Sequence, residues 1–200
     1  MESSNRFEGK NDYLKRLPDE YYRGQAYVHW SMAMDHRRTG WLTPPLHSVF
    51  REILTHALFR YGIFCPIYCC MPDHIHLLWM GIFDRTDQRN AGRYFRRQLN
   101  LVLERGGVRL QTQPYDHVLR DDERVEKAVE SVVEYIARNP ERAGLVEPGQ
   151  YQTYPFTGCL VPGCPELRLW QPDYWLRLWR VYSFVKQHGL TRLHGEVLES

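Results

Sequence analysis

Two apolar runs joined by Met71-Pro72-Asp73 constrain the fold of this chain more than any other feature. The runs cover residues 64–70 and 74–80, each the length of a strand, and a Pro-Asp pair between such runs is typical of a tight turn. The sequence therefore predicts an antiparallel hairpin. In the second run His74 and His76 alternate with apolar residues, so both imidazoles are expected on one face of the sheet.

Hydrophobic spacing places the remaining elements. It predicts a strand over 26–34, a helix over 46–61 ending at Gly62, a second helix over 89–104, an extended segment over 108–118 and a third helix over 121–138. The third helix would begin at three acidic residues, 121–123, and bury the stripe Val125, Val129, Val132 and Ile136. This order predicts an α+β fold, a ferredoxin-like antiparallel sheet with helices on one face.

The two ends of the chain differ from the middle in composition. Residues 1–24 are polar and are expected to form a loose N-terminal arm, and residues 159–200 form an aromatic-rich C-terminal extension. Two interpretations of the extension's aromatic residues remain open. Either an amphipathic helix covers the core, which we favour, or tryptophans such as Trp170 and Trp175 stack on nucleobases. The helix would bury Leu167, Leu169, Trp175, Leu178, Trp179 and Tyr182.

Bulk composition is that of an ordinary globular protein, with 43% hydrophobic and 25% charged residues. No signal peptide and no run of 18 apolar residues is found, so no membrane span is expected. Five cysteines in a chain without an export signal indicate reduced thiols in the cytoplasm.

The net charge of +2 argues neither for nor against a nucleic-acid partner. Local charge is more informative, because seven arginines and no lysine lie between Arg85 and Arg109. Arginine matches phosphate through its planar fork of donors. A stripe on the second helix is either a solvated face or a track for phosphates, and we give the two interpretations equal weight. Its members are Arg89, Arg93, Arg96 and Arg97.

The histidine pair predicts half of a metal site, since neutral imidazoles bind divalent ions. Asp73 before the pair has a turn role or orients an imidazole. A competing interpretation is structural zinc held by Cys65, Cys69 and Cys70 together with the histidines. The pleat of a strand sends consecutive cysteines to opposite faces, which disfavours that tetrahedron.

A second candidate position lies at the end of the third helix. Tyr135 falls off the predicted buried stripe, with small residues on the preceding turn and Asn139 one turn later. Packing is the common role of such a tyrosine, but here the phenol has room to meet another molecule. Asn139 precedes Pro140 and is expected to mark the helix end, with its amide oxygen directed to the sheet as a possible ligand for a hard cation.

Four strings together resemble one known family. They are MPDHIHLL at 71–78, YDHVLRD at 115–121, YIARNPERAGLV at 135–146 and YPFTG at 154–158. In this order they resemble the REP-associated tyrosine transposases, in the single-tyrosine branch of the HUH single-strand nuclease superfamily. The resemblance covers residues 22–158 and implies a transposase domain over 25–158. Thr157-Gly158 replaces a usual serine pair, and the chain from Glu166 onward lies beyond the resemblance.

The resemblance implies site residues and chemistry. His74 and His76 match the paired metal ligands, Asn139 a common third ligand, and Tyr135 the nucleophile. The implied cofactor is Mg²⁺ or Mn²⁺, and the implied reaction is cleavage and rejoining of single-stranded or hairpin DNA through a 5′-phosphotyrosine. The partner would be DNA at palindromic repeats, the chain a monomer or homodimer, and its location cytoplasmic and nucleoid-associated.

Two alternatives from other classes stay open. One is a DNA-binding protein that keeps the fold without catalysis, and the other is a module stabilised by structural zinc. A covalent adduct with DNA that depends on Tyr135 separates the enzyme from both.

Overall fold

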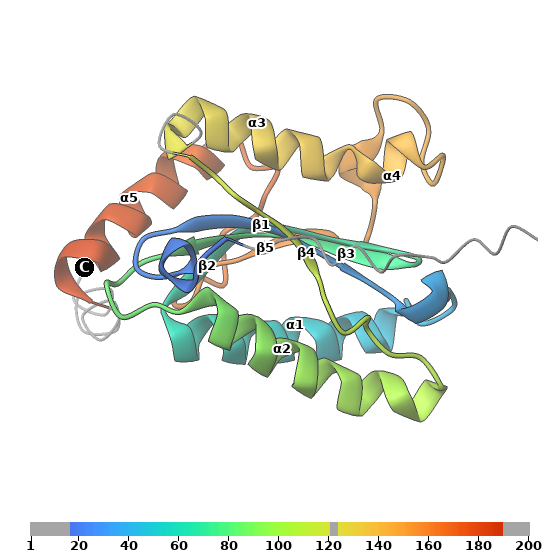
Figure 1. Ribbon diagram of the computed structural model, residues 1–200. Helices are drawn as coiled ribbons and strands as arrows, with labels where there is room; N and C mark the ends of the chain where they lie inside the picture. The colour runs from blue at the N-terminus through green and yellow to red at the C-terminus, as the bar shows by residue number, and fades with distance from the viewer. Residues whose placement is uncertain (1–16, 121–123, 190–200) are drawn as a thin grey trace, which may run out of the picture.

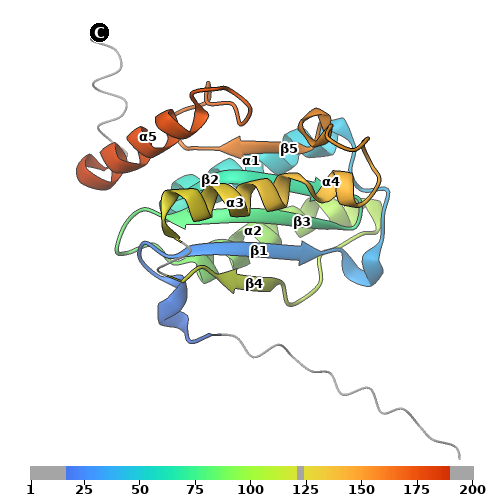
Figure 2. The ribbon, with the colours of Figure 1, turned by 90° about the horizontal axis from the view of Figure 1, so that it is seen from above.

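The computed structural model describes residues 17–120 and 124–189 of the 200-residue chain. Five antiparallel strands form one sheet in the order β4-β1-β3-β2-β5 (Figures 1 and 2). The strands are β1 (Tyr27–Ala33), β2 (Ile63–Met71), β3 (His74–Gly81), β4 (Tyr115–Val118) and β5 (Thr157–Leu160). The α+β class and the antiparallel sheet predicted from the sequence are confirmed.

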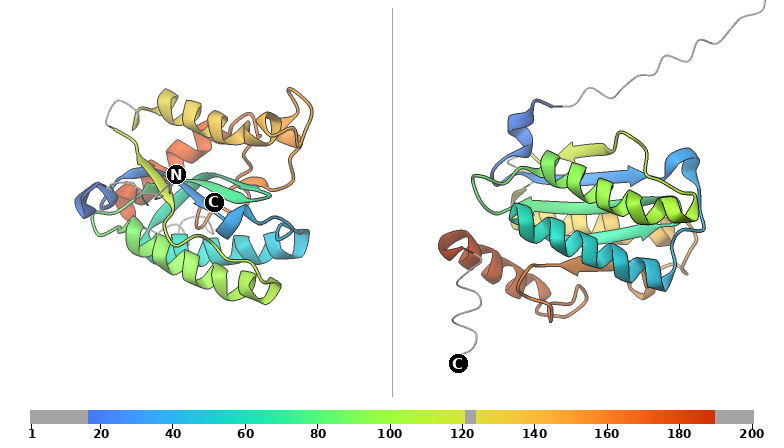
Figure 3. Two further views of the ribbon diagram at one scale, coloured as in Figure 1. Left: turned by 45° about the vertical axis from the view of Figure 1, so that its right-hand side comes forward. Right: turned by 90° about the horizontal axis from the view of Figure 1, so that it is seen from below.

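Helices lie on both faces of this sheet rather than on one. The α-helices are α1 (Pro44–Tyr61), α2 (Gln88–Leu103), α3 (Glu126–Ala137), α4 (Asn139–Arg142) and α5 (Tyr174–His188). Short 3₁₀ turns lie at η1 (Asp19–Tyr22), η2 (Asp35–Arg37), η3 (Glu104–Gly106) and η5 (Tyr151–Thr153). Helices α1 and α2 pack in one core cluster, and α3 and α5 pack in the cluster on the other face (Figures 1 and 3).

The composition of the hairpin explains this two-sided cover. All nine residues of β2 and seven of the eight in β3 are buried, and a strand that is apolar on both faces needs a layer on each. The expectation of helices on one face was therefore wrong in this respect. None of the helices in the described ranges is long and apolar enough to span a bilayer.

The predicted hairpin is confirmed as β2–β3. Met71 pairs with His74 and Cys69 with His76, so Pro72 and Asp73 form the turn between them. The Asp73 carbonyl accepts a hydrogen bond from the Met34 amide at 2.8 Å, which ties the turn to the end of β1. The turn that precedes the histidines is thus held by its neighbour strand.

Helix α1 begins and ends at the residues that the sequence indicates. The Thr43 side chain accepts a hydrogen bond from the Leu46 amide, and Pro44 opens the first turn. Gly62 ends the helix with a φ of 66°, in the left-handed region, and a Cβ there would meet the Phe83 ring at 2.4 Å. Glycine is therefore required at this position for two reasons.

The buried stripe of α3 differs from the prediction. Val125 is the N-cap with extended backbone and is 56% exposed, because the helix begins only at Glu126. Val133 is buried, whereas Val132 is only partly buried. The acidic residues 121–123 expected at the helix start lie outside the described residues.

The predicted boundaries of the arm and the extension fall inside folded structure. Tyr22 is fully buried and its hydroxyl donates to Asp116, so this one side chain anchors the otherwise largely exposed segment 17–24 to the core, while residues 1–16 lie outside the described ranges. The boundary at 158/159 divides β5. In α5 the Tyr174 and Tyr182 hydroxyls donate to the carbonyls of Pro66 and Gly81 at 2.6 and 3.0 Å. The expected core-covering helix is confirmed for Leu178 and Tyr182, whereas Leu167 and Leu169 are buried in the segment before the helix.

Candidate metal and nucleophile site

The two histidines of β3 point to the sheet face that carries α3. Their alternation with Ile75 and Leu77, which lie in the core cluster on the α1–α2 face, fixes this direction. His74 Nε2 and His76 Nε2 lie 3.0 Å apart, and His76 is only 9% exposed. The ligand atoms of the predicted pair therefore converge.

A hydrogen-bonded carboxylate orients His74. Asp73 Oδ1 lies 2.6 Å from His74 Nδ1, and Arg37 donates to Asp73 Oδ2 at 3.1 Å. Burial opposes the charge on Asp73, but the His74 hydrogen bond and Arg37 outweigh it and lower the pKa of its carboxyl. An ionised Asp73 accepts a hydrogen bond from His74 Nδ1–H, which directs the Nε2 atom of His74 away from the carboxylate as the donor atom for an ion.

The His76 ring is neutral because it is buried. Burial, with smaller contributions from the neighbouring His29 and His74, lowers its pKa to about 3. A neutral imidazole is the form that binds a metal ion. His76 therefore supplies a neutral nitrogen donor near physiological pH.

His29, to which the sequence assigned no role, completes the cluster. It lies on β1 opposite Leu78, on the same face as His76, and its Nε2 is 3.1 Å from His76 Nδ1. Burial lowers the pKa of His29 to about 4. Alternation in the strand 26–34 places this histidine on a face, but only the pairing of β1 with β3 brings it to His76.

Tyr135 on α3 lies beside this cluster. Its side chain is 51% exposed, and its ring meets the His29 ring edge-on with centroids 6.3 Å apart. The Arg142 guanidinium lies 4.4 Å over the Tyr135 ring and also donates to the Tyr135 carbonyl at 2.8 Å. Arg142, seven residues after the tyrosine, was not identified from the sequence, although that spacing is two helical turns.

Asn139 marks the break between α3 and α4, as its position before Pro140 predicts. Its amide nitrogen donates to the carbonyls of Tyr135 and Ile136 at 3.2 and 3.0 Å. These bonds use both amide protons and leave the oxygen as the remaining polar atom. Its hydrogen bonds in the described chain stay within α3, so the structure does not join Asn139 to the histidine pair.

The arginine stripe lies on α2, on the opposite face of the sheet from α3 (Figure 1). Arg89 forms an ion pair with Asp19, and Arg96 donates to the Gln111 carbonyl. Arg93 and Arg97 are exposed. The stripe and Tyr135 therefore do not share one surface.

The cysteines do not assemble a site with the histidines. Cys69 and Cys70 belong to the core clusters on opposite faces of the sheet, as the pleat predicts. Within residues 17–120 and 124–189, no three or more His, Cys, Asp or Glu side chains are arranged to hold an ion. The histidine pair thus needs further donors of another kind, such as amide, water or phosphate oxygens.

The pair itself fits a divalent ion. When two nitrogen ligands each lie about 2.1 Å from one ion and the N–ion–N angle is about 90°, the two nitrogens are about 3.0 Å apart. The 3.0 Å between the Nε2 atoms of His74 and His76 matches this separation. The donor set of two imidazoles is acceptable to Mn²⁺ and, with oxygen donors added, to Mg²⁺.

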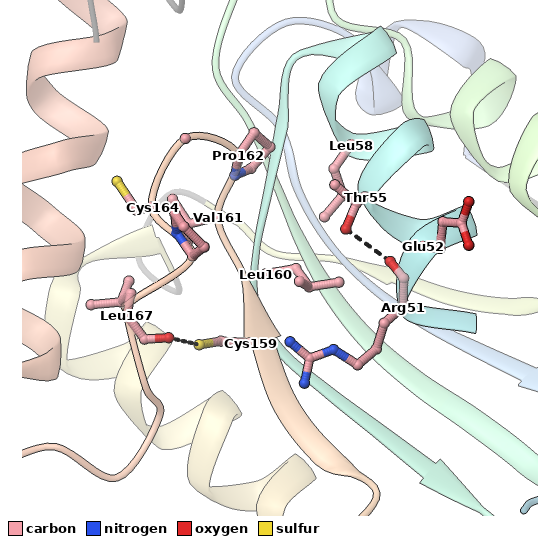
Figure 4. Close-up of a pocket in the computed structure, with 12 residues that line it drawn as sticks. Arg51, Glu52, Thr55, Leu58, Cys159, Leu160, Val161, Pro162, Cys164 and Leu167 are labelled. Atoms are coloured by element: carbon pink, nitrogen blue, oxygen red, sulfur yellow. Dashed lines mark hydrogen bonds between the residues drawn. The ribbon is translucent and has the colours of Figure 1, made fainter. Parts of the chain in front are cut away.

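The histidine cluster is partly enclosed, because His76 is only 9% exposed and His29 is partly buried. A cavity of about 280 Å³ lies elsewhere, between α1 and the segment that follows β5 (Figure 4), and residues such as Arg51, Thr55 and Leu167 line it. On the histidine side of the sheet, α3 lies over β2 and β3, whereas β4 lies at the edge of the sheet, away from α3 (Figure 2). Tyr115 and His117 of β4 are exposed there, and Tyr115 pairs with Ser31, the partner of His76.

The sequence matches no protein-family model and no curated protein. Among solved structures, the fold is similar to that of a REP-associated tyrosine transposase bound to a REP hairpin, with a TM-score of 0.59. The two chains are 19% identical, and the match covers 72% of this chain and 82% of the other. At this identity the likeness shows a shared fold, not shared residue roles.

Proposed function

We propose that this chain is a metal-dependent transposase of the single-tyrosine HUH type. It would cleave and rejoin single-stranded or hairpin DNA at palindromic repeats. The observation that carries the proposal is the 3.0 Å convergence of the His74 and His76 Nε2 atoms, with His29 between His76 and the Tyr135 ring. The sequence resemblance and the similar fold of a transposase bound to a hairpin add support.

In this proposal His74, His76 and Asn139 would hold Mg²⁺ or Mn²⁺, and the ion would supply Lewis-acid polarisation of the scissile phosphate. The Tyr135 hydroxyl attacks phosphorus and loses its proton, while the bond from phosphorus to the 3′ oxygen breaks and that oxygen gains a proton. A 5′-phosphotyrosine and a free 3′-hydroxyl result. Attack by another 3′-hydroxyl reverses the step and joins strands without ATP, because the covalent bond conserves the energy.

Arg142 is suited to assist the nucleophile. Its guanidinium lies 4.4 Å over the Tyr135 ring, and its hydrogen bond to the Tyr135 carbonyl holds it there. A fixed positive charge favours the negative charge that develops on the phenolic oxygen as the proton leaves. Arg142 therefore acts on the nucleophile without contacting the histidines.

The DNA strand would lie over the β4 edge of the sheet. Tyr115 is 53% exposed there and offers a stacking surface for a base. Two hydrogen bonds hold the chain after β1 against the segment 107–109: the Arg38 side chain donates to the Gly107 carbonyl, and the Asp35 amide donates to the Arg109 carbonyl. Three exposed arginines therefore lie at this end of β1, next to the turn that precedes the histidines: Arg37, Arg38 and Arg109. These groups suit a phosphate backbone.

The proposal assigns the transposase domain to residues 25–158 and an extension to 159–200, with β5 shared by both. It takes the chain as a monomer or homodimer at the nucleoid, in the cytoplasm.

The decisive test uses a labelled hairpin oligonucleotide with Mn²⁺. We expect a covalent protein–DNA adduct on a denaturing gel, lost in Tyr135→Phe and on chelation. Tyr21→Phe is the matched control, because Tyr21 is similarly exposed, at 50%, on η1. DNA binding without any adduct from the wild type would contradict the proposal and favour a non-catalytic DNA-binding protein.

A further inference from the structure

A chain of side-chain contacts runs through the histidine pair. Arg37 contacts Asp73 at 3.1 Å, Asp73 contacts His74 at 2.6 Å, and His74 contacts His76 at 3.0 Å. His76 Nδ1 then meets His29 Nε2 at 3.1 Å. Both ring nitrogens of His76 are thus engaged, one on the side of the proposed metal and one on the side of His29.

Proton counting makes these contacts informative. A neutral imidazole carries one N–H, and its other nitrogen is a lone pair. The Asp73 carboxylate fixes the His74 proton on Nδ1, so the His74 Nε2 lone pair points to His76. His76 can direct its own Nε2 lone pair to the same point only if its proton lies on Nδ1. An acceptor is then needed at Nδ1, and His29 Nε2 stands there.

We propose that His29 is a positioning residue, which accepts a hydrogen bond from His76 Nδ1 and so turns the His76 Nε2 lone pair toward the proposed cation. The inference rests on the proposed function, because it takes His74 and His76 as ligands. Asp73 and His29 then have the same role: Asp73 accepts a hydrogen bond from His74 Nδ1, and His29 accepts one from His76 Nδ1, so each orients one ligand.

The surroundings of His29 suit this role. The residue is held on β1 between β3 and β4, with Leu78 and His117 as its strand partners. The His29 ring also lies edge-on to the Tyr135 ring, with the two ring centroids 6.3 Å apart, and this packing restricts the rotation of the His29 ring. The His29 nitrogen that faces His76 is therefore fixed in place.

Metal affinity measures the role directly. Mn²⁺ binding to the protein without DNA is followed by the EPR signal of the free ion. We expect His29→Phe to weaken Mn²⁺ binding 10- to 100-fold, the usual effect of losing a hydrogen-bond partner of a ligand. His29→Gln should restore binding to within a few-fold, because its amide oxygen can accept the same hydrogen bond. His56→Phe, on the exposed face of α1, is the control and should bind like the wild type.

Nitrogen-15 NMR of wild-type His76 tests the inference without any variant. In the protein saturated with Mg²⁺, we expect the His76 proton on Nδ1 and an unprotonated Nε2. The opposite tautomer would overturn the inference. So would either of two binding results: His29→Phe binds Mn²⁺ as tightly as the wild type, or His29→Gln binds Mn²⁺ as weakly as His29→Phe. Failure of the proposed function looks different, because the wild type would then bind no Mn²⁺ that depends on His74 or His76.

Discussion

Buried histidines make the stability of this protein sensitive to acid. His76, His29 and His47 have their pKa values lowered to about 3, 4 and 4, mainly by burial. Each remains neutral in the folded chain well below the pH at which an unfolded histidine, with a pKa of about 6.5, takes up a proton. The folded state therefore binds fewer protons than the unfolded state between pH 6.5 and 4.

We predict that the free energy of unfolding of the metal-free protein falls as the pH drops from 6.5 to 4. His76 and His29 each contribute roughly 1 kcal/mol per pH unit over the window between the folded and unfolded pKa values, and the more exposed His47 contributes less because solvent screens it. Urea unfolding at several pH values measures the slope. His76→Ala should flatten it, because the variant lacks one of the three groups, whereas exposed His56→Ala should not. Equal slopes for the wild type and His76→Ala would contradict this.

The histidine pair was predictable from the sequence because strand alternation fixes the face of each side chain. His29 was not, since its contact with His76 depends on the register of β1 against β3, where Ser31 faces His76. Arg142 was missed because its position over Tyr135 depends on the break between α3 and α4. Local periodicity does not encode either arrangement.

At the scale of elements, the limits of β1, α1, the hairpin and α2 agree closely with the sequence prediction, because each has a clear period and clear end signals. The start of α3 was misplaced: the acidic residues 121–123 and the valine pattern from Val125 predicted an earlier start, whereas Val125 is the N-cap and the helix begins at Glu126. The cover of the second sheet face by α3 and α5 was not predicted, although the apolar runs of β2 and β3 on both faces of the sheet indicate a layer on each face.

Asn139 allows the end of α3 and the proposed metal site to be tested separately. Its amide holds the carbonyls of Tyr135 and Ile136, so Asn139→Ala should cost about 1 kcal/mol of stability. If its oxygen is also a ligand, Mn²⁺ affinity should fall too. Asn139→Asp keeps an oxygen but loses both donors, and we expect it to be destabilised yet to retain Mn²⁺. Thermal unfolding measures the change in stability, and Mn²⁺ titration measures the change in affinity. If Asn139→Ala binds Mn²⁺ as tightly as the wild type, Asn139 only caps the helix and is not a metal ligand.

On the scale of the whole molecule, the sheet separates two candidate contact surfaces. The histidines and Tyr135 lie on the α3 side, and the exposed arginines of α2 lie on the other (Figures 1 and 3). A short unpaired strand at Tyr135 would not reach α2, whereas a folded hairpin has a stem that extends beyond the site. We therefore propose that Arg93 and Arg97 contact the stem.

We predict that Arg93→Ala with Arg97→Ala lowers the salt dependence of hairpin binding. The log–log slope should fall by about 0.9 for each phosphate that the variant no longer neutralises. Adduct formation with a short unpaired oligonucleotide should be unchanged. Arg180→Ala with Lys186→Ala removes the same charge from exposed positions of α5 and serves as the control. A slope equal to that of the control would contradict this contact and favour the interpretation of the arginine stripe as a solvated face.

The sheet ends on both sides in a short strand, β4 and β5, of four residues each. Free backbone donors and acceptors along an outer strand are what another chain uses to extend a sheet, and short outer strands provide few of them. Growth of the sheet from one molecule into the next is therefore disfavoured. Any pairing of two copies has to use helices or loops as its contact.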